Sequence, residues 1–267
     1  MLITRLPRID KTMTDKTPEN DVDINQVRLE IDRVDKALLN LIAERLELSK
    51  AVRRAKAGIR VWRPSREDSH VRELAAATRD TPGPLVSRIW AELMSASLAM
   101  QGPMKLHVAL DGDAMSSLTL VRDRFGASIP TYTYPTASSA LAATYADDEG
   151  VAVLPAPGGM QNWWTALGTE GAMPDMHILA GLPRTGQQDW PRAVAVATAD
   201  IQPSGNDETL ILSKADIRAI HEGAVLRASS EQRQLYSLPG YFKNLPKSVK
   251  ELDATACIIG VIPKPIG

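Results

Sequence analysis

Two cationic side chains, Arg45 and Lys56, fall on the apolar face of one predicted helix, where they could bind an anion. Arg45 takes the place of an apolar residue, and Lys56 follows eleven residues later, about three turns along nearly the same face. Apolar residues otherwise recur at steps of four and three, as in a helix that packs on other helices: Val27, Ile31, Val34, Leu38, Leu41, Leu48, Val52 and Ala55. Because a charge held away from water is costly unless an opposite charge meets it, and no acidic residue breaks the stripe, the pattern favours an anionic ligand.

Arg45 could instead have a purely structural role. It could pair with an acidic side chain of another helix, including Glu44 or Glu47 of a second copy, or its long side chain could reach the surface. Two further cations follow at Arg63 and Arg66. A group of cations on and beside one apolar face favours the anion site over a lone ion pair.

Three helices are predicted to position these side chains. Asp23 begins the first with a pattern like a capping box, and Gly58 is placed to end it. Pro64 can open a second helix as its first residue, extending to about residue 79. A third helix ends at Gln101, before a Gly-Pro pair.

The length of the first helix predicts a partner. About 30 residues span roughly 45 Å, whereas a compact domain of about 80 residues has a radius of gyration of only about 12 Å. Such a helix extends beyond its own domain and leaves part of its apolar stripe uncovered. A symmetric homodimer is the usual way to cover it.

From about residue 104 the pattern changes to short β-rich runs that alternate with helical ones. The expected strands lie at 105–110, 151–154, 177–182 and 193–197. One helix is expected to end at residue 125, and another is expected near 137–145. This alternation indicates an α/β layer with a largely parallel sheet. The last sixty residues read β, α, β, β, α, β, from 209–212 to 258–262.

The sequence therefore predicts a multidomain chain. Residues 1–21 are polar and mixed in charge, without the apolar core of a signal peptide, and are expected to be a disordered tail. Met13 could be the true start. An all-α three-helix domain is expected over 22–102 and an α/β domain over 103–267, the latter in two parts, about 104–205 and about 206–267.

Composition excludes several classes of function. The 267 residues carry a net charge of -1, which argues against nucleic acid or an anionic membrane as the main partner. No apolar run reaches the roughly 18 residues of a membrane span. The single Cys257 forbids an internal disulfide and fits a reducing cytoplasm. The four histidines, at 70, 107, 177 and 221, show no metal-ligand spacing, so no metal is expected.

The helical part carries a specific motif. It runs Val27-Arg28-Leu-Glu-Ile31-Asp-Arg-Val-Asp35-Lys-Ala-Leu38-Leu39-Asn-Leu-Ile-Ala-Glu44-Arg45 and continues with Lys56, Arg66-Glu67 and Ser97-x3-Gln101. This motif resembles the all-helical chorismate mutases. The resemblance implies an intertwined helical dimer that binds chorismate and rearranges it to prephenate, on the way to phenylalanine and tyrosine, without metal or cofactor.

The resemblance also implies a role for each of seven residues. Arg28 would reach across the dimer to a substrate carboxylate, while Arg45 would hold a carboxylate within its own subunit with help from Arg66. Lys56 and Gln101 would flank the ether oxygen. Glu67 would accept the ring hydroxyl, and Ser97 would line the pocket. Each has a plainer reading. Arg28 could be a solvated helix residue, Glu67 a charge facing the helix dipole, and Ser97 with Gln101 could bond to a neighbouring helix.

One departure of this sequence from the family pattern indicates an alternative activity. Where the family often has an aspartate shortly before the second helix, this chain has Trp62-Arg63-Pro64-Ser65. The same loop separates mutases from the related isochorismate-pyruvate lyases, so lyase activity is the enzymatic alternative. A non-catalytic effector-binding or partner-binding protein with a mutase-like dimer is the other. Because all seven residues lie between Arg28 and Gln101, the helical segment alone is expected to suffice for catalysis.

The second part resembles other proteins only in fragments. Leu106-His-Val-Ala-Leu-Asp-Gly, Arg124-Phe-Gly126, 140–145 and 150–155 are similar to the first lobe of prephenate dehydratases. The Glu-Asn-Ser of that family is replaced by Ala156-Pro157-Gly158, so no dehydratase activity is expected. The ending, 238–263, resembles the amino-acid-sensing ACT module and implies an aromatic amino acid as a possible effector. Trp163-Trp164 could line a pocket or lie in the core.

Overall fold

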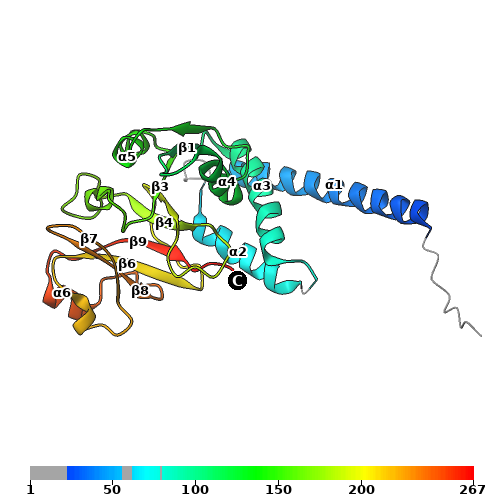
Figure 1. Cartoon of the computed structure of the whole chain (residues 1–267). Helices are drawn as coiled ribbons and strands as arrows, with labels where there is room; N and C mark the ends of the chain where they lie inside the picture. The colour runs from blue at the N-terminus through cyan, green and yellow to red at the C-terminus, as the bar shows by residue number, and fades with distance from the viewer. Residues whose placement is uncertain (1–22, 56–61, 79) are drawn as a thin grey trace, which may run out of the picture. The chain divides into compact units, whose positions relative to one another are not determined.

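The computed structural model describes residues 23–55, 62–78 and 80–267 (Figure 1). It divides into two compact units, one ending at Arg45 and the other running from Leu46 to Gly267. The predicted tail at 1–21, the start at Met13 and the site residue Lys56 lie outside the described residues.

Three helices occupy the N-terminal part, as predicted: α1 (Ile24–Ala55), α2 (Pro64–Ala77) and α3 (Gly83–Gln101). Asp23 accepts a hydrogen bond from the Asn25 amide at 2.9 Å and so caps α1. Proline stands in the first turn of both α2 and α3, where its missing N–H costs nothing. The α3 helix ends at Gly102, whose amide bonds to the Leu98 carbonyl. These ends follow from local sequence signals.

An α/β region follows, with nine strands in one sheet in the order β2-β1-β3-β5-β4-β9-β6-β8-β7. The strands are β1 (Lys105–Val108), β2 (Thr131–Thr133), β3 (Gly150–Pro155), β4 (His177–Leu182), β5 (Ala193–Ala197), β6 (Asp207–Ser213), β7 (Val225–Ser229), β8 (Gln234–Pro239) and β9 (Cys257–Pro263). The helices are α4 (Ala114–Phe125), α5 (Ala137–Tyr145) and α6 (Lys247–Leu252), with 3₁₀ turns η1 (Trp163–Ala166) and η2 (Ile217–Ala219).

The expectation of a largely parallel sheet is wrong. Only β1 with β2, β1 with β3, and β4 with β9 pair in parallel, while the other five pairings are antiparallel. A parallel pair needs a long crossover, whereas an antiparallel pair can be joined by a short loop. Between β3 and β4 the chain forms only the turn η1 and loops, and residues 183–192 join β4 to β5 without a helix. The alternation of strand and helix stops at β3.

The order of elements in the last sixty residues is as predicted, with the first helix reduced to the single turn η2. The strand β9 lies between β4 and β6 in the sheet. The last strand of the chain therefore joins the 104–205 part to the 206–267 part in one sheet.

Both faces of the sheet are covered by apolar side chains. Along β5, Val194 and Val196 point into one core, which also contains Leu141 of α5. The alternate residues of β5 point into a second core, with Val121 of α4, Leu98 of α3 and Trp62 before α2. This alternation explains why every residue of β5 is buried. Helices α3 and α4 thus pack on one face and α5 on the other. No helix among the described residues is long and apolar enough to cross a membrane.

Candidate functional site

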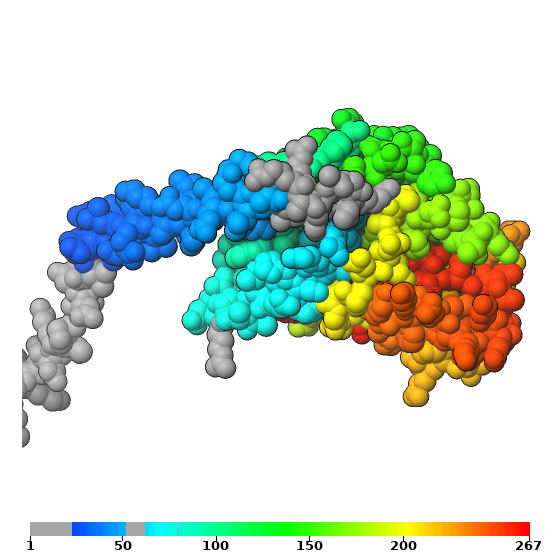
Figure 2. All heavy atoms as spheres, turned by 180° about the vertical axis from the view of Figure 1, so that it is seen from behind, coloured from blue at the N-terminus to red at the C-terminus, as the bar shows by residue number. Residues whose placement is uncertain are grey.

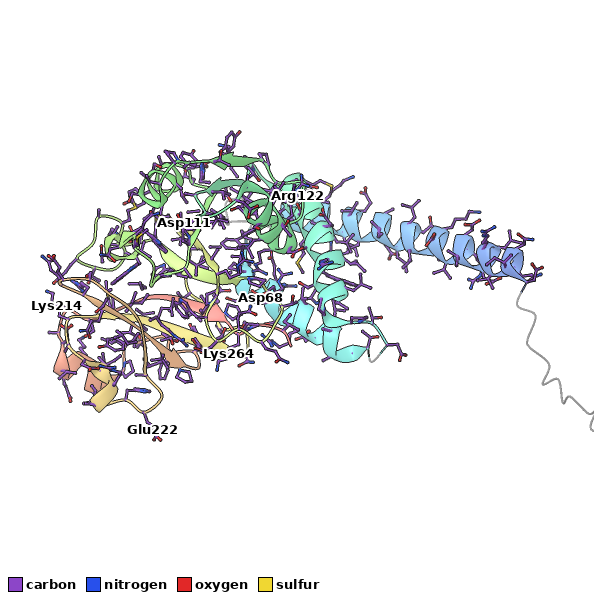
Figure 3. The ribbon with its side chains drawn as sticks, in the orientation of Figure 1. Asp68, Asp111, Arg122, Lys214, Glu222 and Lys264 are labelled. Atoms are coloured by element: carbon purple, nitrogen blue, oxygen red, sulfur yellow. The ribbon has the colours of Figure 1, made fainter. Side chains whose placement is uncertain are left out.

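The α2 helix presents two adjacent acidic residues to the α/β region. Asp68 receives two parallel hydrogen bonds of 2.9 Å from Arg124 of α4 and a third, of 2.8 Å, from Nε of Arg184, which follows β4. The Glu67 carboxylate lies 3.8 Å from Nη2 of Arg124 and 3.6 Å from Nη2 of Arg184. Figure 3 marks Asp68 on α2, beside the sheet. We call these four residues the acid–arginine cluster.

The acid–arginine cluster is almost closed to solvent. The side chains of Asp68, Arg124 and Arg184 are 5%, 1% and 3% exposed, and that of Glu67 is 14% exposed. Burial raises the pKa of Glu67 to about 7, although the Arg124 charge opposes this shift. Burial also raises the pKa of Asp68, against the opposing charge and hydrogen bonds of Arg124. The hydrogen bonds from the two guanidinium groups favour the ionised form of Asp68 and so oppose the effect of burial.

Further hydrogen bonds tie α2 to the loop before β6 and to the end of β9. The hydroxyls of Ser65 and Ser69 donate to the carbonyls of Gln202 and Ser204, each at 2.7 Å. Arg72 donates to the Lys264 carbonyl at 2.5 Å. In Figure 2 the yellow chain near residue 200 runs directly beside the cyan helices. The α2 helix is therefore held by the α/β region along its length.

The loop residue Arg63, which departs from the mutase pattern, also contacts this region. Its Nη2 donates to the side chain of Gln202 at 3.2 Å, on the exposed surface. The next site residue, Arg66, is exposed.

The α3 helix carries Ser97 and Gln101 on one face, four residues apart. The Ser97 hydroxyl donates to the Leu93 carbonyl at 2.7 Å and accepts a hydrogen bond of 3.1 Å from the hydroxyl of Ser49, on the part of α1 that belongs to the same unit. Gln101 is half-buried at the last position of α3. The bond between Ser97 and Ser49 agrees with the plainer reading of Ser97, a contact to a neighbouring helix.

The unit that ends at Arg45 contains the other two arginines. Arg28 is exposed and Arg45 half-buried. Partial burial lowers the pKa of the Arg45 guanidinium. The apolar stripe of the same helix is exposed, with Ile31 at 53% and Leu41 at 62%. The structure thus brings Glu67, Ser97 and Gln101 into one unit, on the packed helices α2 and α3, and keeps Arg28 and Arg45 in the other.

Sequence reasoning misses three members of the acid–arginine cluster. Asp68 does not stand out from the sequence, although it shares a helical face with the buried residues Ser65 and Val71. Arg184 carries no local signal, and Arg124 stands out only as part of a dehydratase-like fragment. A charged residue on the buried face of α2 is the available clue.

Two pockets of the α/β region are separate from these helices. One lies where β4 and β9 end, and Glu208 and Lys264 line it among several prolines, with their charged atoms 3.7 Å apart. The other is lined by Trp163, Thr136 and Gln161, among others. Trp163 therefore lines a pocket while Trp164 is fully buried in the core. Among the described residues, no three His, Cys, Asp or Glu side chains are grouped to hold a metal ion.

Comparisons with known proteins identify the helical part. Residues 27–102 match the family model of chorismate mutase type II. A comparison with curated proteins finds no match. Among solved structures, one described as "GqqA- a novel type of quorum quenching acylases" aligns with 60% of this chain and 95% of that chain, at 14% identity and a TM-score of 0.37. A likeness this low carries no functional inference. The chain thus has an N-terminal helical chorismate mutase domain, followed by an α/β region.

Proposed function

We propose that the chain is a chorismate mutase that rearranges chorismate to prephenate in the cytoplasm, as a step toward phenylalanine and tyrosine. The match of residues 27–102 to the chorismate mutase type II family carries the proposal. The reaction needs no nucleophile, proton transfer or cofactor: the substrate must be held in a compact form while a C–O bond breaks and negative charge gathers on the ether oxygen. Positioned cations and hydrogen-bond donors suffice.

Arginines bind the two carboxylates of the substrate in this proposal. Arg45 binds one from within the subunit, with help from Arg66, and Arg28 of the partner subunit binds the other. Guanidinium groups suit this role because they bind carboxylates through two parallel hydrogen bonds. The partial burial of Arg45 supports it, since a partly desolvated cation attracts an anion more strongly than one in water.

Polar groups of the other helices bind the reacting part of the substrate. Lys56 and Gln101 donate hydrogen bonds to the ether oxygen as its charge develops. Glu67 accepts the ring hydroxyl, and Ser97 lines the pocket. The half-buried place of Gln101 at the end of α3 supports its role, because it leaves the amide accessible beside buried structure.

A homodimer is part of the proposal, since the site would be incomplete without the second copy. The exposed apolar side chains of α1 support it: a row of large apolar residues on one helix face is unusual on a monomer surface. They include Ile31, Val34, Leu38 and Leu41.

The test is a chorismate-consumption assay on the purified full chain, with identification of the product. Prephenate supports the proposal, and no turnover would leave a non-catalytic binding protein. Turnover of isochorismate to pyruvate instead would identify the lyase, which the presence of Arg63 in the discriminating loop favours as the second candidate. Arg45→Leu should abolish activity, while Arg33→Leu, at an exposed arginine of the same helix that pairs with Glu30, should not. Adding phenylalanine or tyrosine to the assay tests the proposed effector.

A further inference from the structure

We propose that Arg124 and Arg184 of the α/β region are positioning residues of the chorismate site, which hold the Glu67–Asp68 pair of α2 in place. The α/β region is then a required part of the mutase. The inference rests on the proposed function, because it takes Glu67 as the group that accepts the substrate hydroxyl.

Asp68 accepts hydrogen bonds from both arginines of the cluster. Its Oδ1 accepts from Arg124 at 2.9 Å and from Arg184 at 2.8 Å, while its Oδ2 accepts from Arg124 at 2.9 Å. A forked donor that meets both oxygens fixes the orientation of a carboxylate as well as its position. Because Glu67 is the adjacent residue of the same helix, fixing Asp68 also fixes the backbone that carries Glu67.

Glu67 is the most exposed member of the cluster, with 14% of its side chain open to solvent. Its Oε2 lies near both guanidinium groups, but at 3.6 and 3.8 Å it is beyond the usual length of a hydrogen bond. The Nη1 and Nη2 donors of Arg184 are buried and make no hydrogen bond to any described residue. A cluster that served only to hold the fold would be expected to use these donors. Here their charge faces Glu67 while the carboxylate keeps its capacity to accept from a substrate hydroxyl.

The two arginines also set the charge of Glu67. Burial favours the neutral acid, and the Asp68 charge adds to this effect. Arg124 from α4 and Arg184 after β4 oppose it, and Arg72 of α2 adds a positive charge near Asp68. The Trp62 side chain, which precedes α2, also acts to lower the pKa of Glu67. An ionised carboxylate accepts a stronger hydrogen bond than a neutral acid, so the arginines raise the fraction of Glu67 that is in its better accepting form.

The experiment compares Arg184→Met with Arg88→Met in the full chain. Arg88 is a suitable control because it too is an arginine paired with an aspartate. It lies on α3 and pairs with Asp123 of α4 at 3.5 Å, but at the surface. We measure kcat and KM for chorismate from pH 5 to 9, together with the melting temperature. Loss of one nearby cation should raise the pKa of Glu67 by about one unit or more. As the medium is acidified, Arg184→Met should therefore lose activity at a pH about one unit higher than the wild type. Its KM should be raised about fivefold at pH 7 and recover near pH 9.

Arg184→Lys keeps the positive charge but lacks the forked donors of a guanidinium group, and it should restore most of the wild-type pH profile. The same measurements are made on this variant if Arg184→Met does not fold. Combining Arg184→Met with Glu67→Gln removes the titrating group, so the shift of the profile should disappear. If the 184 variants melt at a lower temperature but keep the wild-type pH profile and KM, Arg184 only supports the fold and the inference is wrong. An inactive wild-type chain would instead overturn the proposed function, and this inference with it.

Discussion

Asp68 of α2 and Arg124 of α4 are joined by two parallel hydrogen bonds of 2.9 Å across 56 residues of sequence. The bonds connect the chorismate mutase domain to the α/β region through groups that water hardly reaches. Contacts of this kind couple the stability of the two regions, because loss of one partner leaves the opposite charge buried and unpaired.

Removing one partner should therefore be costly. Asp68→Ala leaves two buried guanidinium groups without their acceptor, and we expect the free energy of unfolding to fall by about 3–5 kcal/mol. Asp123→Ala breaks the exposed pair with Arg88 and should cost less than about 1 kcal/mol. Urea denaturation of both variants measures the difference. Equal, small losses would mean that the buried cluster does not stabilise the contact between the two regions.

Glu67 should make stability depend on pH. Its pKa rises from an ordinary value of 4.5 to about 7 on folding, so the folded protein holds a proton that the unfolded chain releases between these values. The stabilisation is complete below about pH 4.5 and disappears as the pH rises through about 7. It amounts to on the order of 3 kcal/mol.

Glu67→Gln isolates this effect, because the amide resembles the protonated acid and does not titrate. We expect the variant to match the wild type near pH 4.5 and to be the more stable protein at pH 8. Thermal melts across this range check the difference. Parallel pH dependences in the two proteins would show that Glu67 has an ordinary pKa in the folded state.

Gln101 should donate to the ether oxygen in the proposed reaction. Gln101→Ala should lower kcat by about 10²–10³ at every pH, the usual scale for one such donor. Gln101→Glu can donate only while protonated, so its activity should be highest in acid and decline as the pH rises past the pKa of the new carboxyl, which is about 4.3 when unperturbed. Gln232→Glu, at an exposed position, is the control. A Gln101→Glu enzyme with the wild-type pH profile would remove this side chain from the reacting centre.

The α1 stripe should mediate dimerisation. Leu41 is 62% exposed within one copy, and replacing it with glutamate would place a charge in the proposed interface, where desolvation is unfavourable. Asn40→Glu adds the same charge at the neighbouring exposed position, off the stripe. Light scattering after gel filtration should detect monomers for Leu41→Glu and dimers for Asn40→Glu. Identical masses for the two variants would place any interface elsewhere.

The sequence alone predicted the three N-terminal helices, most of the strands and the order of elements in the last sixty residues. These features depend on local signals: the spacing of apolar residues along α1, the prolines that open α2 and α3, and Gly102 after α3. The family of the helical domain could also be recognised, because its polar residues keep a fixed order along the chain.

Tertiary structure alone determined the pairing of strands and the surroundings of α2. Whether neighbouring strands run parallel depends on where each connection crosses the sheet, and β9 joins β4 and β6 from the far end of the chain. The expectation that the helical segment suffices for catalysis did not include the arginines that hold Asp68, which lie 56 and 116 residues away. Local patterns report which face of a helix is apolar, but the partner of a buried charge is decided only when distant segments pack together.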